Sequence, residues 1–196
     1  LATLLLAALS VPFLSIPVSA AESGTCGDGL TWSLSAGTLT ISGNGDMTEF
    51  TELTMAPWYE QRDRISRVVI TDGVQSIAPL AFYDCKKLTS VYLPDSVTKI
   101  GSYAFANCEG LESIRLSPSL GVIEAAAFHS CYKLVAVTLP SSLVTLGNQA
   151  FYRCESLATV TVPPHLSRMG TSVFAYCKSL IRAEVSAKLG VLPEWT

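Results

Sequence analysis

Five cysteines stand at equal intervals in the chain, and thiols are the side chains here with the widest possible chemistry. Each closes a Phe-x-x-Cys motif, preceded by alanine in four copies and by valine in the fifth, and the copies are 23 residues apart. They are Cys85, Cys108, Cys131, Cys154 and Cys177, while Cys26 lies outside the series. Thiols in such a series can form disulfides, bind a metal or pack as small apolar groups.

The equal spacing favours buried free thiols, because it places the cysteines at equivalent positions of successive structural units. Equivalent Cα atoms in adjacent coils lie about 5 Å apart, which is within disulfide range, but the Cβ vectors run parallel and do not converge. One or two disulfides, or a metal site, remain as alternatives. Burial would raise the pKa of the thiols and keep them unreactive.

No other motif predicts catalysis or cofactor binding. His129 and His165 occupy different positions of the repeat and have no cysteine or carboxylate at metal-ligand spacing. A nucleophile elbow, a phosphate-binding loop, a dinucleotide fingerprint and an H-E-x-x-H motif are all missing from the sequence. The formal net charge of -3 over 196 residues argues against a nucleic-acid partner. We therefore expect a protein that is not an enzyme and that needs no metal or cofactor.

Residues 1–20, LATLLLAALSVPFLSIPVSA, read as a secretory signal peptide. The segment is apolar, ends in small residues, and is interrupted by Pro12 and Pro17 without a charged flank, which disfavours a membrane anchor. We expect cleavage after Ala20 or Ala21, no membrane span in the mature chain, and an extracellular or cell-surface location. No Met or basic region precedes the segment, which suggests that the true start is missing.

Residues 21–64 do not share the repeat and are expected to form an N-terminal cap. Residues 29–43 alternate apolar and polar side chains about a Ser-Ala-Gly turn, which predicts a β-hairpin with one buried side. Residues 42–47, SGNGDM, supply a loop, and Pro57 stands where a short helix could begin. A stack of repeats needs such a cap to cover its first apolar edge.

From residue 65 to 196, apolar residues recur at fixed positions of a 23-residue unit, whose clearest copy is residues 88–110. Val91 and Leu93, two residues apart, predict a short strand with one buried side. Ala104, Cys108 and Leu111 stand at i, i+4 and i+7, which predicts about two helical turns. One unit cannot bury this apolar surface alone, so the units are expected to stack. The last unit is incomplete at Thr196, one residue before the next expected Phe, which favours a truncated sequence.

These positions resemble the BspA-type leucine-rich repeat family, whose pattern is L-x-x-V-x-L-P-x-x-V-x-x-I-x-x-x-A-F-x-x-C. The resemblance covers residues 65–196, and CGDGLTW and PWYEQR in the cap are also similar to segments that precede such repeats. The asparagine of the general leucine-rich repeat is replaced by Ser96, Ser119, Ser142 and His165. The resemblance implies a right-handed solenoid on exported or surface proteins, often linked to adhesion, and it transfers no catalytic site.

Candidate binding residues are those that alternate with the buried strand positions and therefore point outward. Six strands spaced about 4.8 Å apart would form a face roughly 25 Å long, suited to a peptide, a loop or a protein patch. We expect Tyr92 and Arg115 to anchor a ligand, because Tyr and Arg are enriched at binding hot spots. The alternative is that these are ordinary solvated strand residues. The candidates are Arg67, Val69, Ser90, Tyr92, Ser113, Arg115, Thr138, Thr161, Arg182 and Glu184.

Tyrosines in or near the Phe-x-x-Cys turns are a second, weaker candidate for a binding surface. They could contact sugars, but we expect their rings to pack along the outer wall with the hydroxyls in water. The five are Tyr83, Tyr103, Tyr132, Tyr152 and Tyr176.

The sequence as a whole predicts an α/β repeat solenoid, with short strands on one face and short helical turns on the other. Its expected role is that of an exported, non-catalytic module that binds a protein or glycan at a cell surface or matrix. A passive spacer that displays other domains, and the non-catalytic part of a larger cell-wall enzyme, are the alternatives.

Overall fold

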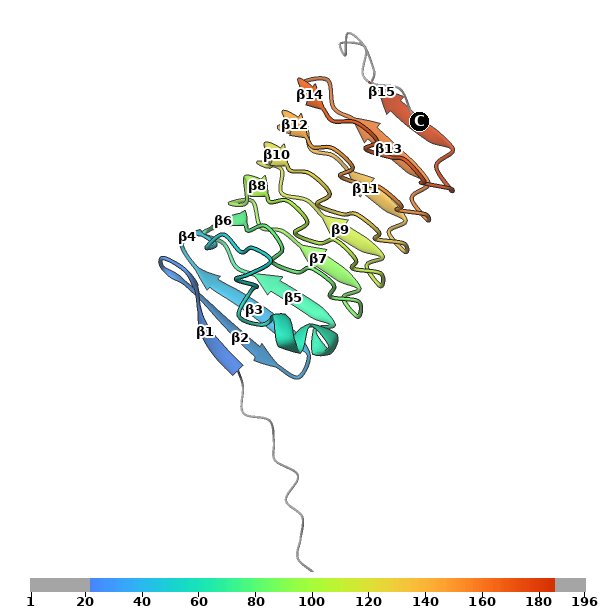
Figure 1. Cartoon of the computed structure of the whole chain (residues 1–196). Coiled ribbons are helices and arrows are strands. Elements are labelled where there is room, and N and C mark those ends of the chain that lie inside the picture. Colours follow the sequence, from blue (N-terminus) through green and yellow to red (C-terminus); the bar gives the residue numbers. More distant parts are fainter. Residues whose placement is uncertain (1–21, 186–196) are drawn as a thin grey trace, which may run out of the picture.

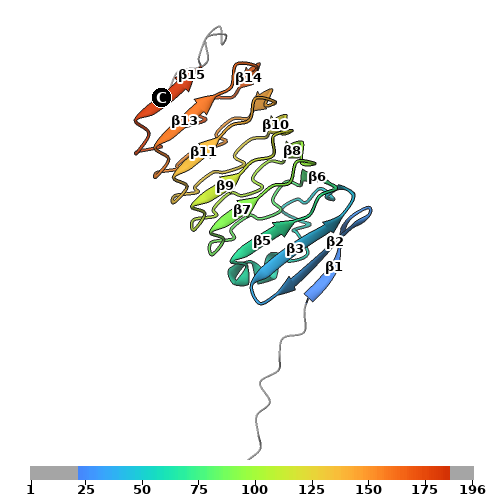
Figure 2. The same cartoon turned by 180° about the vertical axis from the view of Figure 1, so that it is seen from behind.

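The computed structural model describes residues 22–185, and these form a stack of similar coils (Figure 1). Each coil from residue 67 onward places one strand in a large sheet and, up to β14, one strand in a small sheet. Turns join the two sheets, as the view from behind also shows (Figure 2). The architecture is therefore a β-solenoid. The signal peptide predicted for residues 1–20 and residues 186–196 of the incomplete unit lie outside the described residues.

The large sheet has nine strands, in the order β1-β2-β3-β5-β7-β9-β11-β13-β15. Its strands from β3 onward run parallel, and residues 23 positions apart are direct neighbours, as Val91 and Ile114 are. This pairing confirms the short strands expected from the two-residue spacing of apolar side chains. The repeat strands are β5 (Arg67–Ile70), β7 (Ser90–Tyr92), β9 (Ser113–Arg115), β11 (Ala136–Thr138), β13 (Thr159–Val162) and β15 (Arg182–Val185).

The small sheet has six strands, most of them only two residues long, in the order β14-β12-β10-β8-β6-β4. It contains the second member of the second apolar pair, Ile100, while the first member, Val97, lies just before β8; both side chains are fully buried. Its first strand falls within residues 42–47, where the sequence predicts only a loop. The strands are β4 (Gly45–Asp46), β6 (Val74–Ile77), β8 (Lys99–Ile100), β10 (Val122–Ile123), β12 (Thr145–Leu146) and β14 (Arg168–Met169).

Three antiparallel strands begin the described chain: β1 (Glu22–Gly27), β2 (Leu30–Ser35) and β3 (Thr38–Gly43). The predicted hairpin is present as β2 and β3. Ala36 and Gly37 form its turn, with φ values of 47° and 78°, the left-handed pair that fits a two-residue hairpin. Strand β3 then pairs in parallel with β5, so the hairpin continues the large sheet. The short helix near Pro57 is a 3₁₀ helix, η1 (Tyr59–Arg64).

The prediction of helical turns in the Phe-x-x-Cys segments is wrong, because no α-helix occurs in residues 22–185. Leu80 and Asp84 have φ values of 57° and 62°, and side-chain-bearing residues in that region do not continue a right-handed helix. The N–H groups of Phe82 and Asp84 donate to the next coil, to the carbonyls of Ala104 and Ala106 at 2.7 and 2.9 Å. Bonding between coils therefore replaces the i to i−4 bonding of a helix.

A column of stacked aromatic rings, contributed by the turn segments, runs through the core from coil to coil. Adjacent phenylalanine rings lie 5.0 to 5.6 Å apart between centroids, with interplanar angles of 18° or less. Trp58 extends the column from the N-terminal side: it stacks on Phe82 at 5.9 Å, and its Nε1 donates to the carbonyl of Ala81 at 2.7 Å. The repeat thus fixes one ring per coil, at Phe82, Phe105, Phe128, Phe151 and Phe174.

Candidate binding face

The outward side of the large sheet brings the predicted binding residues together, and we call it the strand face. In the register of the sheet, Ser90 lies beside Ser113 and Tyr92 beside Arg115. Thr138 lies beside Thr161, and the backbone of Glu184 follows next. The strand residues on either side of the buried positions therefore form two rows that cross all the coils.

Most of the predicted residues are exposed to solvent. Exposed members are Arg67, Ser90, Tyr92, Ser113, Arg115, Thr138 and Thr161. Val69 is only half-buried, whereas Val68 and Val91, which alternate with these rows, are buried. For Arg182 and Glu184 the structure gives the strand register alone.

The expected anchor pair is in direct contact. The guanidinium carbon of Arg115 lies 4.5 Å from the centre of the Tyr92 ring, while 54% of Tyr92 remains exposed. A cation over an aromatic face contributes about 0.5–1 kcal/mol at an exposed site. The contact holds two long side chains in one arrangement before any ligand arrives.

A recess of about 250 Å³ lies next to this pair, over β5 and β7, the first two repeat strands. Arg67, Val69, Ser90 and Tyr92 line it, together with strand residues Val68 and Ile70. Four of the predicted residues therefore line the recess, and they contribute one cationic, one aromatic and one hydroxyl group. These are groups that hydrogen-bond and stack with a peptide or a sugar.

Sequence reasoning missed that the strand face continues onto the N-terminal hairpin. Thr38 and Thr40 of β3 lie beside Arg67 and Val69 of β5, in line with the two rows. A shallow groove of about 410 Å³ follows over β1 to β3, lined mainly by hydroxyl side chains. The alternation in TWSLSAGTLTIS already contains these outward Ser and Thr residues. What it does not contain is the parallel pairing of β3 with β5. The hydroxyl-bearing lining residues are Ser23, Thr25, Thr31, Ser33, Thr40 and Ser42.

His129, one of the two histidines considered as metal ligands, has structural partners, whereas His165 is exposed. His129 stacks on Tyr152 at 4.8 Å between ring centroids, and its Nδ1 lies 2.9 Å from Ser130 Oγ. Burial, together with the charge of Arg153, lowers the pKa of His129. Within residues 22–185, no group of three or more His, Cys, Asp or Glu side chains could hold a metal ion.

The cysteines are free thiols, and every one of them is buried except Cys177, which is half-buried. Burial raises the pKa of Cys85 and of Cys177 to about 12. Such thiols are poor nucleophiles and poor metal ligands, because both roles need the thiolate.

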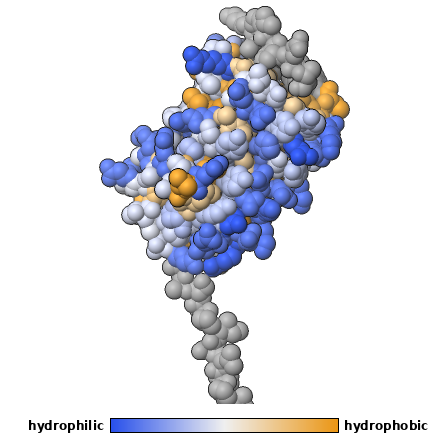
Figure 3. Space-filling model, in the orientation of Figure 1, coloured by the Kyte–Doolittle hydropathy of each residue, from blue (hydrophilic) through white to orange (hydrophobic). Residues whose placement is uncertain are grey.

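The surface seen in the orientation of Figure 1 is largely polar, with small and separate hydrophobic patches (Figure 3). Exposed apolar side chains such as Leu53 and Val135 lie in separate loops, outside the strands. In the part of the chain that the structure describes, no helix is long and apolar enough to cross a membrane.

Comparison with solved structures finds bacterial leucine-rich repeat proteins. One from Eubacterium ventriosum is 28% identical, with a TM-score of 0.76 over 86% of this chain and 45% of that protein. One from Bacteroides ovatus is 31% identical, with a TM-score of 0.57 over 82% of this chain and 40% of that protein. The T. pallidum leucine rich repeat protein is 25% identical, with a TM-score of 0.55 over 80% of this chain and 79% of that protein. This chain thus spans less than half the length of the first two.

The family comparison agrees with the geometry of the coils. None of the curated proteins matches the chain. The model of the BspA type leucine rich repeat region, however, matches six copies across residues 57–181. That range begins just before η1 and takes in the stacked phenylalanines and the five repeat cysteines. The chain therefore belongs to the BspA-type leucine-rich repeat family.

Proposed function

We propose that this chain is an exported, non-catalytic binding module whose strand face holds a protein or glycan at a cell surface or in a matrix. The observation that carries the proposal is the contact between Arg115 and Tyr92, 4.5 Å from guanidinium carbon to ring centre, beside the recess at Arg67 and Ser90. Aromatic and arginine side chains that are already held in place lose less conformational freedom on binding, and they are enriched at hot spots.

The dimensions of the strand face support a polymeric ligand. Strands about 4.8 Å apart place the rows across a distance of roughly 25 Å from β5 to β15. The continuation onto β3, β2 and β1 adds hydroxyl side chains that can donate to and accept from a peptide backbone or a sugar. An extended ligand could therefore contact several coils at once.

The proposed location rests on the apolar residues 1–20 and on family membership. Export would place the strand face outside the cytoplasm, where matrix proteins and surface glycans are the available partners. The free buried thiols are compatible with that compartment, since a thiol with a raised pKa reacts slowly.

The test is direct binding of the purified chain to an array of matrix proteins and glycans, with hits followed by calorimetry. The proposal expects saturable binding to at least one member, weakened by a peptide or oligosaccharide that competes for the same face. Absence of binding across the array would contradict it and would favour the passive spacer. That alternative fits the finding that the chain spans only 45% of its Eubacterium ventriosum relative.

A further inference from the structure

A cavity of about 440 Å³ lies away from the strand face, where the N-terminal segment meets the first two repeat turns. We call it the tyrosine cavity. Three of its six lining residues are tyrosines, which come from η1 and from two successive coils. The lining residues are Glu52, Met55, Tyr59, Leu80, Tyr83 and Tyr103. Its volume falls in the range of small-molecule sites, about 300–1,000 Å³.

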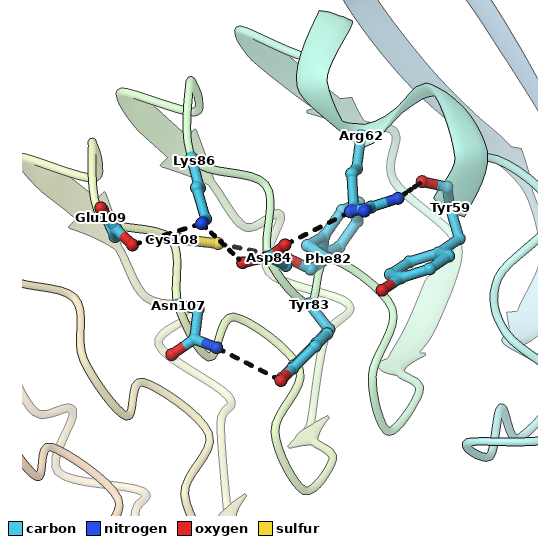
Figure 4. A network of polar contacts seen from close by, with 9 residues as sticks. All are labelled: Tyr59, Arg62, Phe82, Tyr83, Asp84, Lys86, Asn107, Cys108 and Glu109. Atoms are coloured by element: carbon cyan, nitrogen blue, oxygen red, sulfur yellow. Dashed lines mark hydrogen bonds and ion pairs between the residues drawn. The ribbon is translucent and has the colours of Figure 1, made fainter.

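Two of the three aromatic walls are held in place by polar contacts (Figure 4). Asn107 Nδ2 donates to the hydroxyl of Tyr83 at 3.2 Å. The guanidinium carbon of Arg62 lies 4.1 Å from the ring centre of Tyr59, and Arg62 in turn donates to Asp84 at 3.3 Å. The Tyr59 and Tyr83 rings are therefore held in position in the absence of a ligand.

The loop that carries the acidic lining residue is also closed on itself. Thr51 and Thr54 exchange backbone hydrogen bonds at 3.2 and 3.1 Å, and their hydroxyls lie 2.8 Å apart. Glu52 lies between them and is exposed at the cavity. The tight turn thus places Glu52 at the rim of the cavity.

The described residues that line the cavity include an acidic side chain but no basic one. Among the described residues that line the cavity, Glu52 is the one acidic residue, and neither lysine nor arginine lines it. Of the basic groups labelled in Figure 4, Arg62 lies over the Tyr59 ring and pairs with Asp84 at 3.3 Å, and Lys86 pairs with Asp84 and Glu109 at 3.6 Å. Aromatic faces also carry partial negative charge.

We propose that the tyrosine cavity binds a small molecule through an alkylated ammonium group. Such a cation gains from the ring faces and from the Glu52 carboxylate, while its methyl groups fit against Met55 and Leu80. The contact of Arg62 with Tyr59 shows that a ring of this set already accepts a cation. A neutral sugar would gain nothing from the one-sided charge. An anion would be repelled by it.

The experiment is calorimetric titration of the purified chain with choline chloride and with its uncharged isostere 3,3-dimethylbutanol. Saturable choline binding is expected, at least tenfold tighter than binding of the isostere. Three results would each overturn the proposal: equal affinity for choline and its isostere, higher affinity for neutral saccharides, or no detectable choline binding at any concentration titrated.

Variants locate the site. Tyr103→Ala removes an exposed wall and is expected to weaken choline binding about 3- to 30-fold, the range that one cation–π contact supplies. Glu52→Gln is expected to weaken binding and to reduce its dependence on salt. Tyr176→Ala, an exposed tyrosine outside the cavity, is the matched control and should bind as the unaltered chain does. Unchanged affinity in both Tyr103→Ala and Glu52→Gln would place the cation elsewhere.

The site is independent of the strand face. Replacing Tyr92 and Arg115 should therefore leave choline binding unchanged, so that failure of one proposal does not decide the other.

Discussion

The thiol of Cys108 donates a hydrogen bond to the carbonyl oxygen of Phe82 in the preceding coil, with 3.2 Å between Sγ and O. Cys131, Cys154 and Cys177 repeat the bond at 3.2 Å to Phe105, Phe128 and Phe151. At these four positions the cysteine is therefore both a small buried side chain and a hydrogen-bond donor. A disulfide would remove the donor, which gives a physical reason for free thiols.

The first prediction concerns this bond. Cys131→Ala removes one of the two donors to the Phe105 carbonyl, which keeps the Cys108 N–H at 3.3 Å, and we expect the free energy of unfolding to fall by about 0.5–1.5 kcal/mol. Urea denaturation followed by circular dichroism measures the change. A midpoint within error of the unaltered chain would show that the bond does not stabilise the stack.

The second prediction concerns alkaline pH. Burial, and next the charge of Asp84, raise the pKa of the Cys85 thiol from 9.0 to about 12. The folded state thus keeps a proton that the unfolded state loses, so this contribution to stability is intact below pH 9 and is lost as pH rises toward 12. Stability should fall by up to about 1.4 kcal/mol per pH unit for each such thiol. Denaturation curves from pH 8 to 11 should show a shallower decline in Cys85→Ala.

The third prediction tests the aromatic column. Phe128 is fully buried and stacks on Phe105 and Phe151 at 5.3 and 5.0 Å. Phe128→Ala opens a cavity in a continuous stack and should cost about 3–5 kcal/mol. Thermal and urea denaturation provide the value. A loss below 1 kcal/mol would mean that the stack adapts and that rings at this position are interchangeable with small residues.

The fourth prediction compares two glycines. A Cβ on Gly147 would lie 2.5 Å from the backbone nitrogen of Ala125 in the neighbouring coil, whereas one on Gly121 would meet only the carbonyl of Thr98 at 3.8 Å. Gly147→Ala should therefore push coils apart and destabilise the protein. Gly121→Ala is the matched control and should be neutral or stabilise by up to about 1 kcal/mol, because alanine restricts the unfolded chain. Similar melting temperatures for the two variants would contradict the close approach.

The strands and their buried sides could be predicted from the sequence because a 23-residue period repeats the same apolar pairs. The Phe-x-x-Cys turn could not, since i, i+4 spacing is satisfied both by a helix and by a turn whose N–H groups bond alternately within and between coils. Asp84 and Asn107, at φ values of 62° and 59°, are of the residue types that most readily adopt the left-handed region. They were the available sign that a helix would not form.

The replacement of asparagine by serine also has a structural answer. Ser96 Oγ accepts from the Gly73 N–H at 3.1 Å and donates to the Val74 carbonyl at 2.8 Å, and Ser142 Oγ donates to the Leu120 carbonyl at 2.8 Å. The hydroxyl thus serves backbone groups of the neighbouring coil.

For the candidate site, the outward rows followed from the strand period, while the continuation onto β3 and the tyrosine cavity depend on contacts between distant segments. No local pattern encodes those contacts. Tyr59 and Tyr103, for example, are 44 residues apart in the sequence and line one cavity.

The fifth prediction, and the most direct test of the proposed function, compares two double variants for binding to a partner found in the array. Tyr92→Ala with Arg115→Glu alters the strand face. Tyr176→Ala with Lys133→Glu likewise removes one tyrosine ring and reverses one positive charge, at exposed residues elsewhere. Both should unfold within about 1 kcal/mol of the unaltered chain, since surface substitutions cost little and the exposed cation–π contact contributes about 0.5–1 kcal/mol. The account predicts that the strand-face variant loses at least tenfold in affinity while the matched variant binds normally. Equal affinity in the two variants would contradict the strand face as the recognition surface.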